Sequence, residues 1–245
     1  MNNKPKITII TPCYNSAATI QDTLNAVKAQ NYQNLEHIFI DSCSTDGTLD
    51  ILNMYREEVS YDVKIVSEKD NGIYDAMNKG IAMATGDIIG ISNSDDWYEA
   101  GALEEVAASY KGNKYEIIYG MKRTFDNGIL RSVEFYSHEF LMEQMICHPA
   151  CFVTKAVYED KGVFDLSFRS SSDYDWMIKR FMEKDVVFTP VYKILANMRR
   201  GGMSDTNVGY RETLKLMKQY GQISGFYYRF NVAKSYISDF CKRIK

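Results

Sequence analysis

Two adjacent carboxylates, Asp95 and Asp96, follow a short apolar segment, residues 88–91, that is typical of a buried strand. In open α/β sheets, ligands bind outside the carboxyl ends of the strands, so these acids stand where chemistry is expected. Neighbouring carboxylates repel each other unless a positive group lies between them. Mg²⁺ and Mn²⁺ prefer carboxylate oxygens and take further ligands from substrate phosphates. The segment therefore predicts a site for a metal ion and a diphosphate.

Two other apolar segments, residues 7–10 and 35–40, also run directly into polar residues. If all three are parallel strands, their ends meet in one crevice. There Asp41 can accept the N–H of a uracil ring, while Thr11 and Tyr14 can frame the base. Plainer interpretations remain open: Asp41 can form an Asx turn or cap a helix, and Asp95 with Asp96 can cap the following helix.

The elements that must position these residues follow from hydrophobic periodicity. Strands are predicted at 7–10, 35–40, 63–66 and 88–91. Helices are predicted between them: one starting near Asn15 or Ser16, one from residues 44–47 to about 55, and one over 73–84. This alternation through residue ~100 predicts a parallel sheet covered by helices on both faces.

Beyond residue 101 the pattern is less regular. It predicts a helix at 102–110, a strand at 116–119, a turn at 126–128 leading into 129–135, and helices at 172–182 and 209–220. We expect one domain over residues 1–225, with a regular half at about 1–100 that would bind a nucleotide and a less regular half at about 101–205.

Composition excludes several classes of protein. The 245 residues include 29 Lys and Arg against 32 Asp and Glu, a net charge of −3, which disfavours a nucleic-acid partner. The five cysteines are odd in number and lack Cys-x-x-Cys spacing, so a cytoplasmic protein without disulfides or a zinc site is expected. No stretch approaches the ~20 apolar residues of a spanning helix, so membrane contact should be peripheral.

Four motifs in a fixed order carry a resemblance to a known family. They are Thr11-Pro12-x-Tyr14-Asn15, Asp41-x-x-Ser44-Thr45-Asp46-Gly47-Thr48, Asp70-x-Gly72 with Ala76-x-Asn78-x-Gly80, and Gly86-Asp87 leading to Asn93-Ser94-Asp95-Asp96. Over about residues 6–205 the chain resembles the family 2 glycosyltransferases, whose GT-A (nucleotide-diphospho-sugar transferase) fold is α/β. The resemblance implies a mainly parallel central sheet with helices on both faces, a UDP-sugar donor, and an inverting transfer that uses Mn²⁺ or Mg²⁺. It also implies that residues 1–225 are a single glycosyltransferase domain, with a nucleotide-binding half at about 1–100 and an acceptor-binding half at about 101–205.

The resemblance also implies roles for single residues. Asp41 would contact the uracil, Asp70 would lie beside the base or ribose, and Asp95 would bind the metal. The family has an Asp-any-Asp motif here, and this chain has Asn93 in place of the first Asp. Asn93 can bind the ribose but adds no charge. Asp96 could assist as a second metal ligand. The residues expected to bind the donor are Thr11, Pro12, Tyr14, Asn15, Asp41, Asp70, Asn78, Asn93, Ser94, Arg199 and Arg200.

The segment 171–176 is similar to the one whose Glu-Asp pair supplies the family's catalytic base. Asp173 takes the base position, and Ser172 replaces the supporting Glu. An inverting transfer needs a carboxylate that takes the proton of the acceptor hydroxyl. On a helix, Asp175 would point about 200° away from Asp173, so we expect it to be a surface charge.

Two further segments resemble parts of the family's site. His148 stands before Pro149 in a segment beside the acceptor site, although a lone histidine is commonly structural. Residues 199–204, with Arg199 and Arg200, resemble a loop that closes over the donor diphosphate, where arginine pairs with phosphate in forked geometry. A plain surface turn is the alternative for this loop.

The tail, residues 226–245, places Phe230, Ala233, Ile237 and Phe240 at helical spacing among basic residues. Such an amphipathic basic helix can rest on an anionic membrane or pack on its own domain. Membrane contact would suit an acceptor saccharide carried on a lipid diphosphate, as in the synthesis of surface polysaccharides such as O-antigen, lipopolysaccharide or capsule.

The sequence thus predicts a metal-dependent inverting hexosyl- or N-acetylhexosaminyltransferase. A sugar-nucleotidyltransferase would need a glycine-rich phosphate loop with a basic residue after the first strand, and residues 11–15 offer neither. A catalytically silent nucleotide-sugar binding or scaffold subunit stays open because of Asn93 and Ser172.

Overall fold

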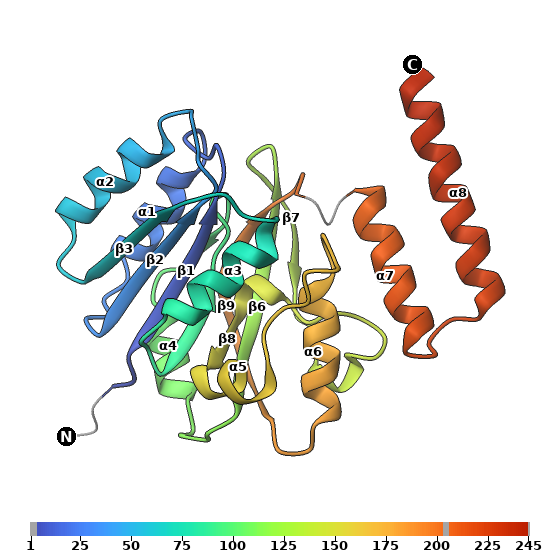
Figure 1. The fold of residues 1–245 in the computed structure, drawn as a ribbon. Coiled ribbons are helices and arrows are strands. Elements are labelled where there is room, and N and C mark those ends of the chain that lie inside the picture. Colours follow the sequence, from blue (N-terminus) through green and yellow to red (C-terminus); the bar gives the residue numbers. More distant parts are fainter. Residues whose placement is uncertain (1–3, 203–205, 245) are drawn as a thin grey trace.

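The structure is a computed structural model that describes residues 4–202 and 206–244. Over these residues the chain forms a nine-stranded sheet in the order β3-β2-β1-β4-β8-β6-β9-β5, with β7 paired to β6 (Figure 1). Helices cover both faces of this sheet, which confirms the predicted α/β class. The sheet is mixed rather than mainly parallel as expected, because the strands added after residue 96 bring antiparallel pairs.

The first half of the sheet is regular. Strands β1 (Ile7–Cys13), β2 (Leu35–Asp41), β3 (Asp62–Ser67) and β4 (Ile88–Ile91) are parallel. Helices α1 (Ile20–Lys28), α2 (Thr48–Glu58) and α3 (Ile73–Met83) connect them. The predicted strands and helices of this half are confirmed. The N-cap of α1 is Thr19, without a side-chain cap, and neither Asn15 nor Ser16 occupies that position.

The second half contains strands that the sequence pattern did not predict. Strand β8 (Cys151–Thr154) runs antiparallel to both β4 and β6 (Glu116–Asp126), and so joins the two halves. Strand β9 (Val187–Arg199) is parallel to β6 and antiparallel to β5 (Trp97–Tyr98). Strand β7 (Ile129–Glu134) completes the expected hairpin with β6. The mixed half therefore supplies the strand that ends at Arg199.

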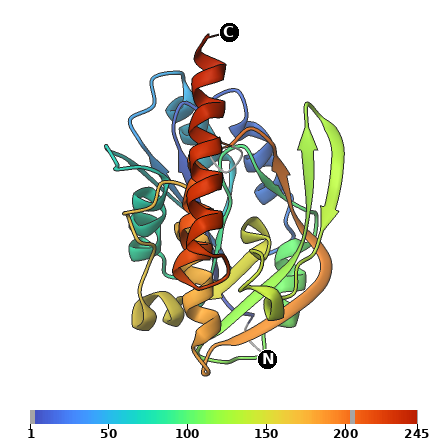
Figure 2. The same ribbon diagram turned by 90° about the vertical axis from the view of Figure 1, so that its right-hand side faces the viewer.

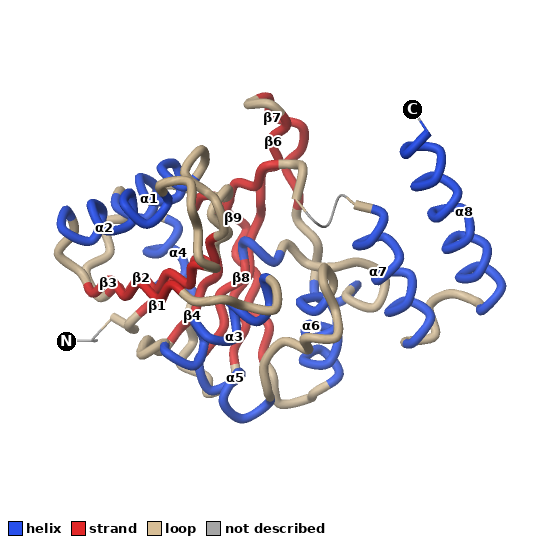
Figure 3. The backbone as a smooth tube through the Cα atoms, turned by 45° about the horizontal axis from the view of Figure 1, so that its top comes forward, coloured by secondary structure: helices blue, strands red, loops and turns tan. Residues whose placement is uncertain are grey.

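The helices form two layers on the sheet. Helices α3, α5 (Lys155–Lys161) and α6 (Ser172–Met182) pack with alternate strand residues such as Ile10 and Ile89. The intervening residues, such as Ile9 and Ile88, face α1 and α4 (Ala102–Ser109) on the other side. This alternation is what a strand buried on both faces produces. Figure 3 shows the strands in the middle, with helices on either side.

The parallel half of the sheet and its helix α3 require glycine at two positions. Gly80 allows α3 to lie against β1, because a Cβ atom there would clash with the Ile10 side chain. Gly72 precedes α3 with φ of 110°, a conformation that disfavours other residues. The Asp70-x-Gly72 motif is thus a tight turn that begins α3.

The C-terminal helices lie outside the sheet layers. Helix α7 (Asn207–Gln219) lies between α6 and α8 (Gly225–Ile244), which is the outermost element in Figure 1. Figure 2 views the molecule from that side, with α8 in front. Among the described residues, no helix is both long and apolar enough to cross a membrane.

Candidate functional site

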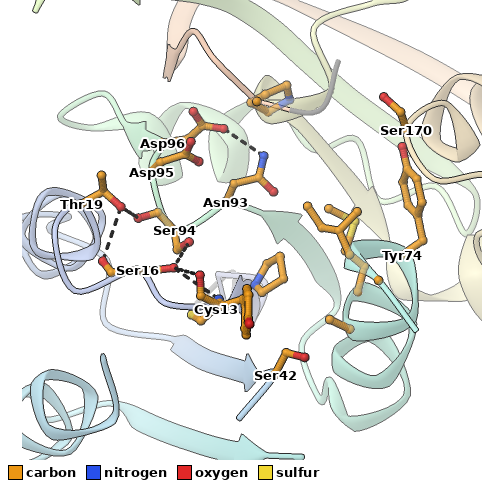
Figure 4. A pocket seen from close by; sticks show the side chains of 18 of the residues that line it. Cys13, Ser16, Thr19, Ser42, Tyr74, Asn93, Ser94, Asp95, Asp96 and Ser170 are labelled. Atoms are coloured by element: carbon orange, nitrogen blue, oxygen red, sulfur yellow. Dashed lines mark hydrogen bonds between the residues drawn. The ribbon is translucent and has the colours of Figure 1, made fainter. Parts of the chain in front are cut away.

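A cavity of about 710 Å³ opens at the carboxyl ends of the parallel strands. Loops after β1, β2, β3 and β4 line one side, and residues from the second half, including His148, Ser170 and Asp173, line the other. Figure 4 shows Asn93, Asp95 and Asp96 on one side of the cavity and Tyr74 and Ser170 across from them. The predicted residues that line it are Pro12, Tyr14, Asn15, Asp70, Asn93, Ser94, Asp95, His148, Asp173 and Arg199.

The acidic loop after β4 concentrates negative charge in a buried place. Burial raises the pKa of Asp95, while the Arg199 guanidinium opposes that rise. Burial and the neighbouring Asp95 carboxylate raise the pKa of Asp96 to about 7. Asn93 donates its amide to Asp96 over 3.1 Å, and its Oδ1 is buried without a hydrogen-bond partner among the described residues. A cation here would relieve the repulsion and complete the coordination of that oxygen.

Arg199 reaches this loop from the end of β9. Its Nη1 donates to the Asp95 carbonyl over 3.1 Å, its backbone N–H donates to Asp96, and its guanidinium pairs with Asp22. The guanidinium also stacks over the Trp97 ring at 4.9 Å. Arg199 therefore shapes the acidic loop as well as lining the cavity.

Arg200 does not line the cavity as predicted. Its backbone N–H donates to the Phe125 carbonyl over 2.8 Å, which continues the ladder between β9 and β6. Of the rest of the predicted loop, Gly202 lines the cavity, and Met203 and Ser204 lie outside the described residues.

Asp41 and Thr11 are buried beneath the cavity instead of lining it. Asp41 Oδ2 accepts from the Ser67 hydroxyl over 2.7 Å and from the Ser44 N–H over 3.0 Å, three residues on rather than the two of an Asx turn. Its Oδ1 is buried with no partner in the described part of the chain. Thr11 bonds instead to His37, whose pKa burial lowers to about 3. Thr11 is thus a support for the strand end and does not frame a base.

The loop after β1 is fixed by its neighbour after β2. Asn15 adopts a left-handed conformation with φ of 47°, and its side-chain oxygen accepts from the Thr45 N–H over 2.9 Å. Asp46 accepts from the backbone of both Ala17 and Thr48. These contacts leave Tyr14 at the cavity with its side chain exposed, where a flat ring can stack.

Asp173 sits in the first turn of α6, and its carboxylate is 23% exposed. Tyr74 donates its hydroxyl to Oδ1 over 2.8 Å, and His148 Nδ1 lies 3.9 Å from Oδ2. Burial lowers the pKa of His148, although the Asp173 charge opposes this, so the imidazole is largely neutral at pH 7. Among the described residues the hydrogen bonds to this carboxylate go to Oδ1, so Oδ2 is open to a hydroxyl group of a substrate.

Asn78 does not line the cavity as predicted. Both ends of its side chain bond to the Phe164 backbone, with the amide donating over 2.9 Å and the oxygen accepting over 3.0 Å. Phe164 in turn packs against the rings of Tyr74 and His148. Asn78 thus acts on the site through the residues around Asp173.

Sequence reasoning missed Glu212, which lies on α7. Its carboxylate accepts from the backbone N–H groups of Arg169, Ser170 and Ser171, over 2.8–3.1 Å. These three residues lead directly into α6 and therefore into Asp173. Glu212 supplies, from a different helix, a carboxylate next to the position where Ser172 replaces the expected Glu. Its identity as a lone acid on an amphipathic helix gave no signal of this contact.

A second cavity, of about 320 Å³, lies on the other side of Asp173. Ser170 and Asp173 line both cavities, so these two residues lie between them. The remaining residues that line the second cavity are Glu143, Gln144, Met145, Ser171, Tyr174, Gly209, Thr213 and Met217. The helix α7 thus contributes to a space that the sequence pattern did not predict.

Asp175 is buried, and its expected position at the surface is wrong. It accepts from the Tyr220 hydroxyl over 2.7 Å and pairs with Lys179 over 2.6 Å, and it is 2% exposed. It points away from Asp173 as expected, but it does so toward the end of α7. Asp175 therefore joins α6 to the α7 region and takes no part in the cavity.

Within the described ranges, no three His, Cys, Asp or Glu side chains gather as a complete metal site. The acidic loop offers two cavity-lining carboxylates: Asp95, and Asp96, which accepts hydrogen bonds from the Asn93 amide and the Arg199 backbone N–H. Mg²⁺ commonly takes one or two carboxylates and fills its coordination with substrate phosphates and water. The donor set thus fits a metal that binds together with a diphosphate.

Known proteins are similar to this chain in sequence and in fold. The model of the family described as "Glycosyl transferase family 2" matches residues 8–154. A "PGL/p-HBAD biosynthesis glycosyltransferase" of Mycobacterium bovis is 31% identical over 220 residues, which cover 86% of this chain and 83% of that protein. A "Putative teichuronic acid biosynthesis glycosyltransferase TuaG" of Bacillus subtilis is 38% identical over 105 residues, covering 42% and 41% of the two chains.

Solved structures share the fold at low identity. S. aureus TarS 1-349 in complex with UDP-GlcNAc superposes with a TM-score of 0.71 at 20% identity, covering 94% of this chain and 71% of that one. The chain spans 39% of a longer TarS structure. The mannosyltransferase PcManGT from Pyrobaculum calidifontis, in complex with GDP-Man and Mn²⁺, has a TM-score of 0.67 at 17% identity, covering 89% and 64%.

Proposed function

This chain belongs to the family 2 glycosyltransferases, and we propose that it moves a sugar from a UDP-sugar to a hydroxyl of a saccharide acceptor, with inversion at the anomeric carbon. One observation carries the proposal: Asp173 lies at the junction of two cavities. A base at that position can meet the acceptor hydroxyl on one side and the anomeric carbon of the donor on the other.

The larger cavity is proposed to hold the donor. Its volume of about 710 Å³ is in the range of small-ligand sites. The Tyr14 ring is available to stack on the base. Asp70 also lines this cavity, and its side chain accepts a hydrogen bond of 2.9 Å from the Gly72 N–H. The unpartnered Asp41 Oδ1 lies under the same strand ends and would accept the uracil N–H after a small movement. Complexes of TarS with UDP-GlcNAc and UDP support uracil as the base.

Mn²⁺ or Mg²⁺ is proposed as the cofactor, held by Asp95 together with the donor diphosphate, with Asn93 Oδ1 and Asp96 nearby. When bound, such an ion neutralises the charge of the departing diphosphate. The Mn²⁺ in the complex of the mannosyltransferase PcManGT supports this assignment. Asn93 and Ser94 are proposed to bind the ribose and the diphosphate end of the donor.

The chemistry needs one base. The acceptor oxygen forms a bond to the anomeric carbon as the bond from that carbon to the diphosphate oxygen breaks, and UDP leaves with the electron pair. Asp173 Oδ2 takes the hydroxyl proton, while the Tyr74 hydroxyl holds Oδ1 and so fixes the orientation of the carboxylate. Glu212 holds the chain that leads into Asp173 and is a positioning residue.

The acceptor is proposed to enter through the second cavity, where Glu143, Gln144 and Thr213 offer hydrogen bonds for sugar hydroxyls. His148 then stands between the two substrates. We extend this proposal to a saccharide carried on a lipid diphosphate. Relatives named for PGL/p-HBAD and teichuronic acid biosynthesis support a product among cell-surface glycoconjugates. A hexosyl or N-acetylhexosaminyl donor fits the same cavity.

A panel of nucleotides tests the donor assignment. UDP, GDP, TDP, CMP and ATP are each added with Mn²⁺, Mg²⁺ or EDTA, and the thermal midpoint is measured. A ligand at 100 times its Kd stabilises the fold by about 2.7 kcal/mol, which moves the midpoint by several degrees. We expect a shift that is specific to UDP and needs the metal. A larger shift with GDP than with UDP would change the assigned donor base from uracil to guanine. No shift with any nucleotide would favour a scaffold subunit.

A further inference from the structure

The outer surface of α8 is apolar, although α8 is the outermost helix. Phe226, Phe230, Ile237 and Phe240 are between 61% and 81% exposed. At about 100° per residue they fall within one stripe about 80° wide along the helix. Ala233, also exposed, lies within the same stripe. A helix that packs on its own domain normally buries such a stripe.

The opposite face of α8, which packs on α7, is polar. Asp239 accepts from Arg211 over 2.7 Å, Ser235 accepts from Arg211 over 3.3 Å, and Asn231 accepts from the Tyr210 hydroxyl over 3.3 Å. Ser235 is only 4% exposed, so α7 and α8 pack closely at this point. By the same helical geometry these residues lie about 180° from the apolar stripe. The hydrogen bonds to α7 thus hold α8 with its apolar stripe outward.

Basic residues flank the stripe. Arg229 and Lys234 are exposed and lie on opposite sides of the stripe, about 60° and 80° from its midline. Residues 225–245 carry five of the 29 basic residues and one of the 32 acidic ones, so this segment is positive while the whole chain is negative. Exposed Tyr227 and Tyr236 stand beside the stripe and suit the boundary between water and lipid.

We infer that α8 is a membrane-binding helix that lies in the surface of an anionic bilayer, with the apolar stripe inserted and the basic residues among the lipid headgroups. Charge complementarity selects this partner over a second copy of the chain, because two α8 helices packed by their stripes would bring their basic flanks together. Anionic lipids would repel the rest of the molecule, which is acidic. This repulsion would orient the protein with α8 toward the membrane.

The attachment of α8 has a consequence for the active site. Helix α7 contacts α8 through Tyr210 and Arg211, and the adjacent Glu212 holds the backbone before Asp173. The second cavity is lined by Thr213 and Met217 of the same helix. Binding through α8 would therefore bring the proposed acceptor entrance close to the lipid surface. This last step rests on the proposed function, whereas the membrane contact itself does not.

Flotation of the full chain with lipid vesicles tests the inference. Wild-type protein is expected to float with vesicles of phosphatidylcholine containing phosphatidylglycerol, and far less with phosphatidylcholine alone. The double variant Phe230→Ser/Ile237→Ser should lose binding by about tenfold or more, since both apolar side chains leave the bilayer. The variant Arg229→Glu/Lys234→Glu should lose the preference for anionic vesicles. Tyr192→Ser removes a 74% exposed aromatic ring on β9 and should bind like wild type.

Three results would overturn the inference: wild type that ignores anionic vesicles, a double variant that binds as wild type does, or a dimer in light scattering that the double variant dissociates. The last result would assign the stripe to a second copy. Thermal unfolding controls for folding, and Phe240→Ser alone replaces the double variant if that variant is unfolded. The UDP-dependent thermal shift should be the same in all these variants, so failure of membrane binding is separate from failure of the donor assignment.

Discussion

The two halves of the sheet position their functional residues in different ways. In the parallel half, β1–β4, the cavity residues stand within a few positions of a strand end, and short loops hold them. In the mixed half, Asp173 is held by Tyr74, 99 residues away, and its preceding loop by Glu212, about 40 residues away. Donor-side residues are therefore placed by the strand ends that they follow, with Arg199 of β9 bonded to the acidic loop, whereas the proposed base is held by α3 and the loop before it by α7.

The largest effect expected from this difference is on turnover in Asp173→Asn. The amide cannot take the hydroxyl proton, so UDP formation from UDP-sugars, with water or an added saccharide as acceptor, should fall about a hundredfold or more. Asp160→Asn, at a partly exposed carboxylate paired with Lys114, is the matched control and should turn over normally. Retained turnover in Asp173→Asn would remove this residue from the chemistry.

Asp95→Ala should affect the other half of the site. Its carboxylate is proposed to bind the metal with the diphosphate, so the variant should lose most of the UDP stabilisation seen with Mg²⁺ or Mn²⁺, about tenfold in Kd. In EDTA, UDP should bind wild type and variant equally. An equal loss with and without metal would show that Asp95 contacts the nucleotide and not a metal.

Glu212→Gln sharpens the comparison further, because Glu212 acts on Asp173 only through the backbone. The neutral amide oxygen accepts N–H bonds more weakly than a carboxylate, so kcat should fall several-fold, by roughly 1 kcal/mol or more in activation free energy, while the KM for the donor stays unchanged. Glu57→Gln, exposed on α2, is the control. If Glu212→Gln lost UDP binding to the same extent as kcat, the role of Glu212 would be to stabilise the fold in general and not to position Asp173.

The smallest effect concerns pH and Asp96. Its pKa is raised from 3.8 to about 7 in the folded protein, so the folded state binds more protons between these values than the unfolded state does. The free energy of unfolding should therefore fall as pH rises from about 4 to 7. Asp96→Asn should melt at a higher temperature than wild type at pH 8, with a smaller difference at pH 5. UDP with Mg²⁺ should reduce the difference in melting temperature between variant and wild type at pH 8. A difference in melting temperature that does not change with pH would contradict the pKa assigned to Asp96.

The regular half could be predicted because local patterns decide it. Each of its strands is a continuous apolar run, and the loops that follow contain the turn residues that hold them, such as Asn15 and Gly72. What could not be predicted there was side-chain direction. Thr11 and Asp41 stand at strand ends, but their side chains turn into the interior, where Thr11 hydrogen-bonds to His37 and Asp41 accepts from the Ser67 hydroxyl.

The mixed half could be predicted only in part. The helix at Ser172–Met182 follows from its periodicity, and its bounds are confirmed. Strand β9 contains Pro190 and pairs with β6 through shifts of register, so neither an alternating pattern nor a clean apolar run marks it. The buried position of Asp175 depends on Tyr220 and Lys179, one of which lies on a distant segment. Contacts of this range leave no trace in local spacing.

The most direct test of the division between the two halves is calorimetric titration of UDP, with Mg²⁺ present, into wild-type protein and Asp173→Asn. A base that serves only the acceptor side predicts the same Kd for both, within about twofold, which is within roughly 0.4 kcal/mol. An Asp173→Asn protein whose Kd is weakened about tenfold would contradict the division, because the carboxylate would then belong to the donor site.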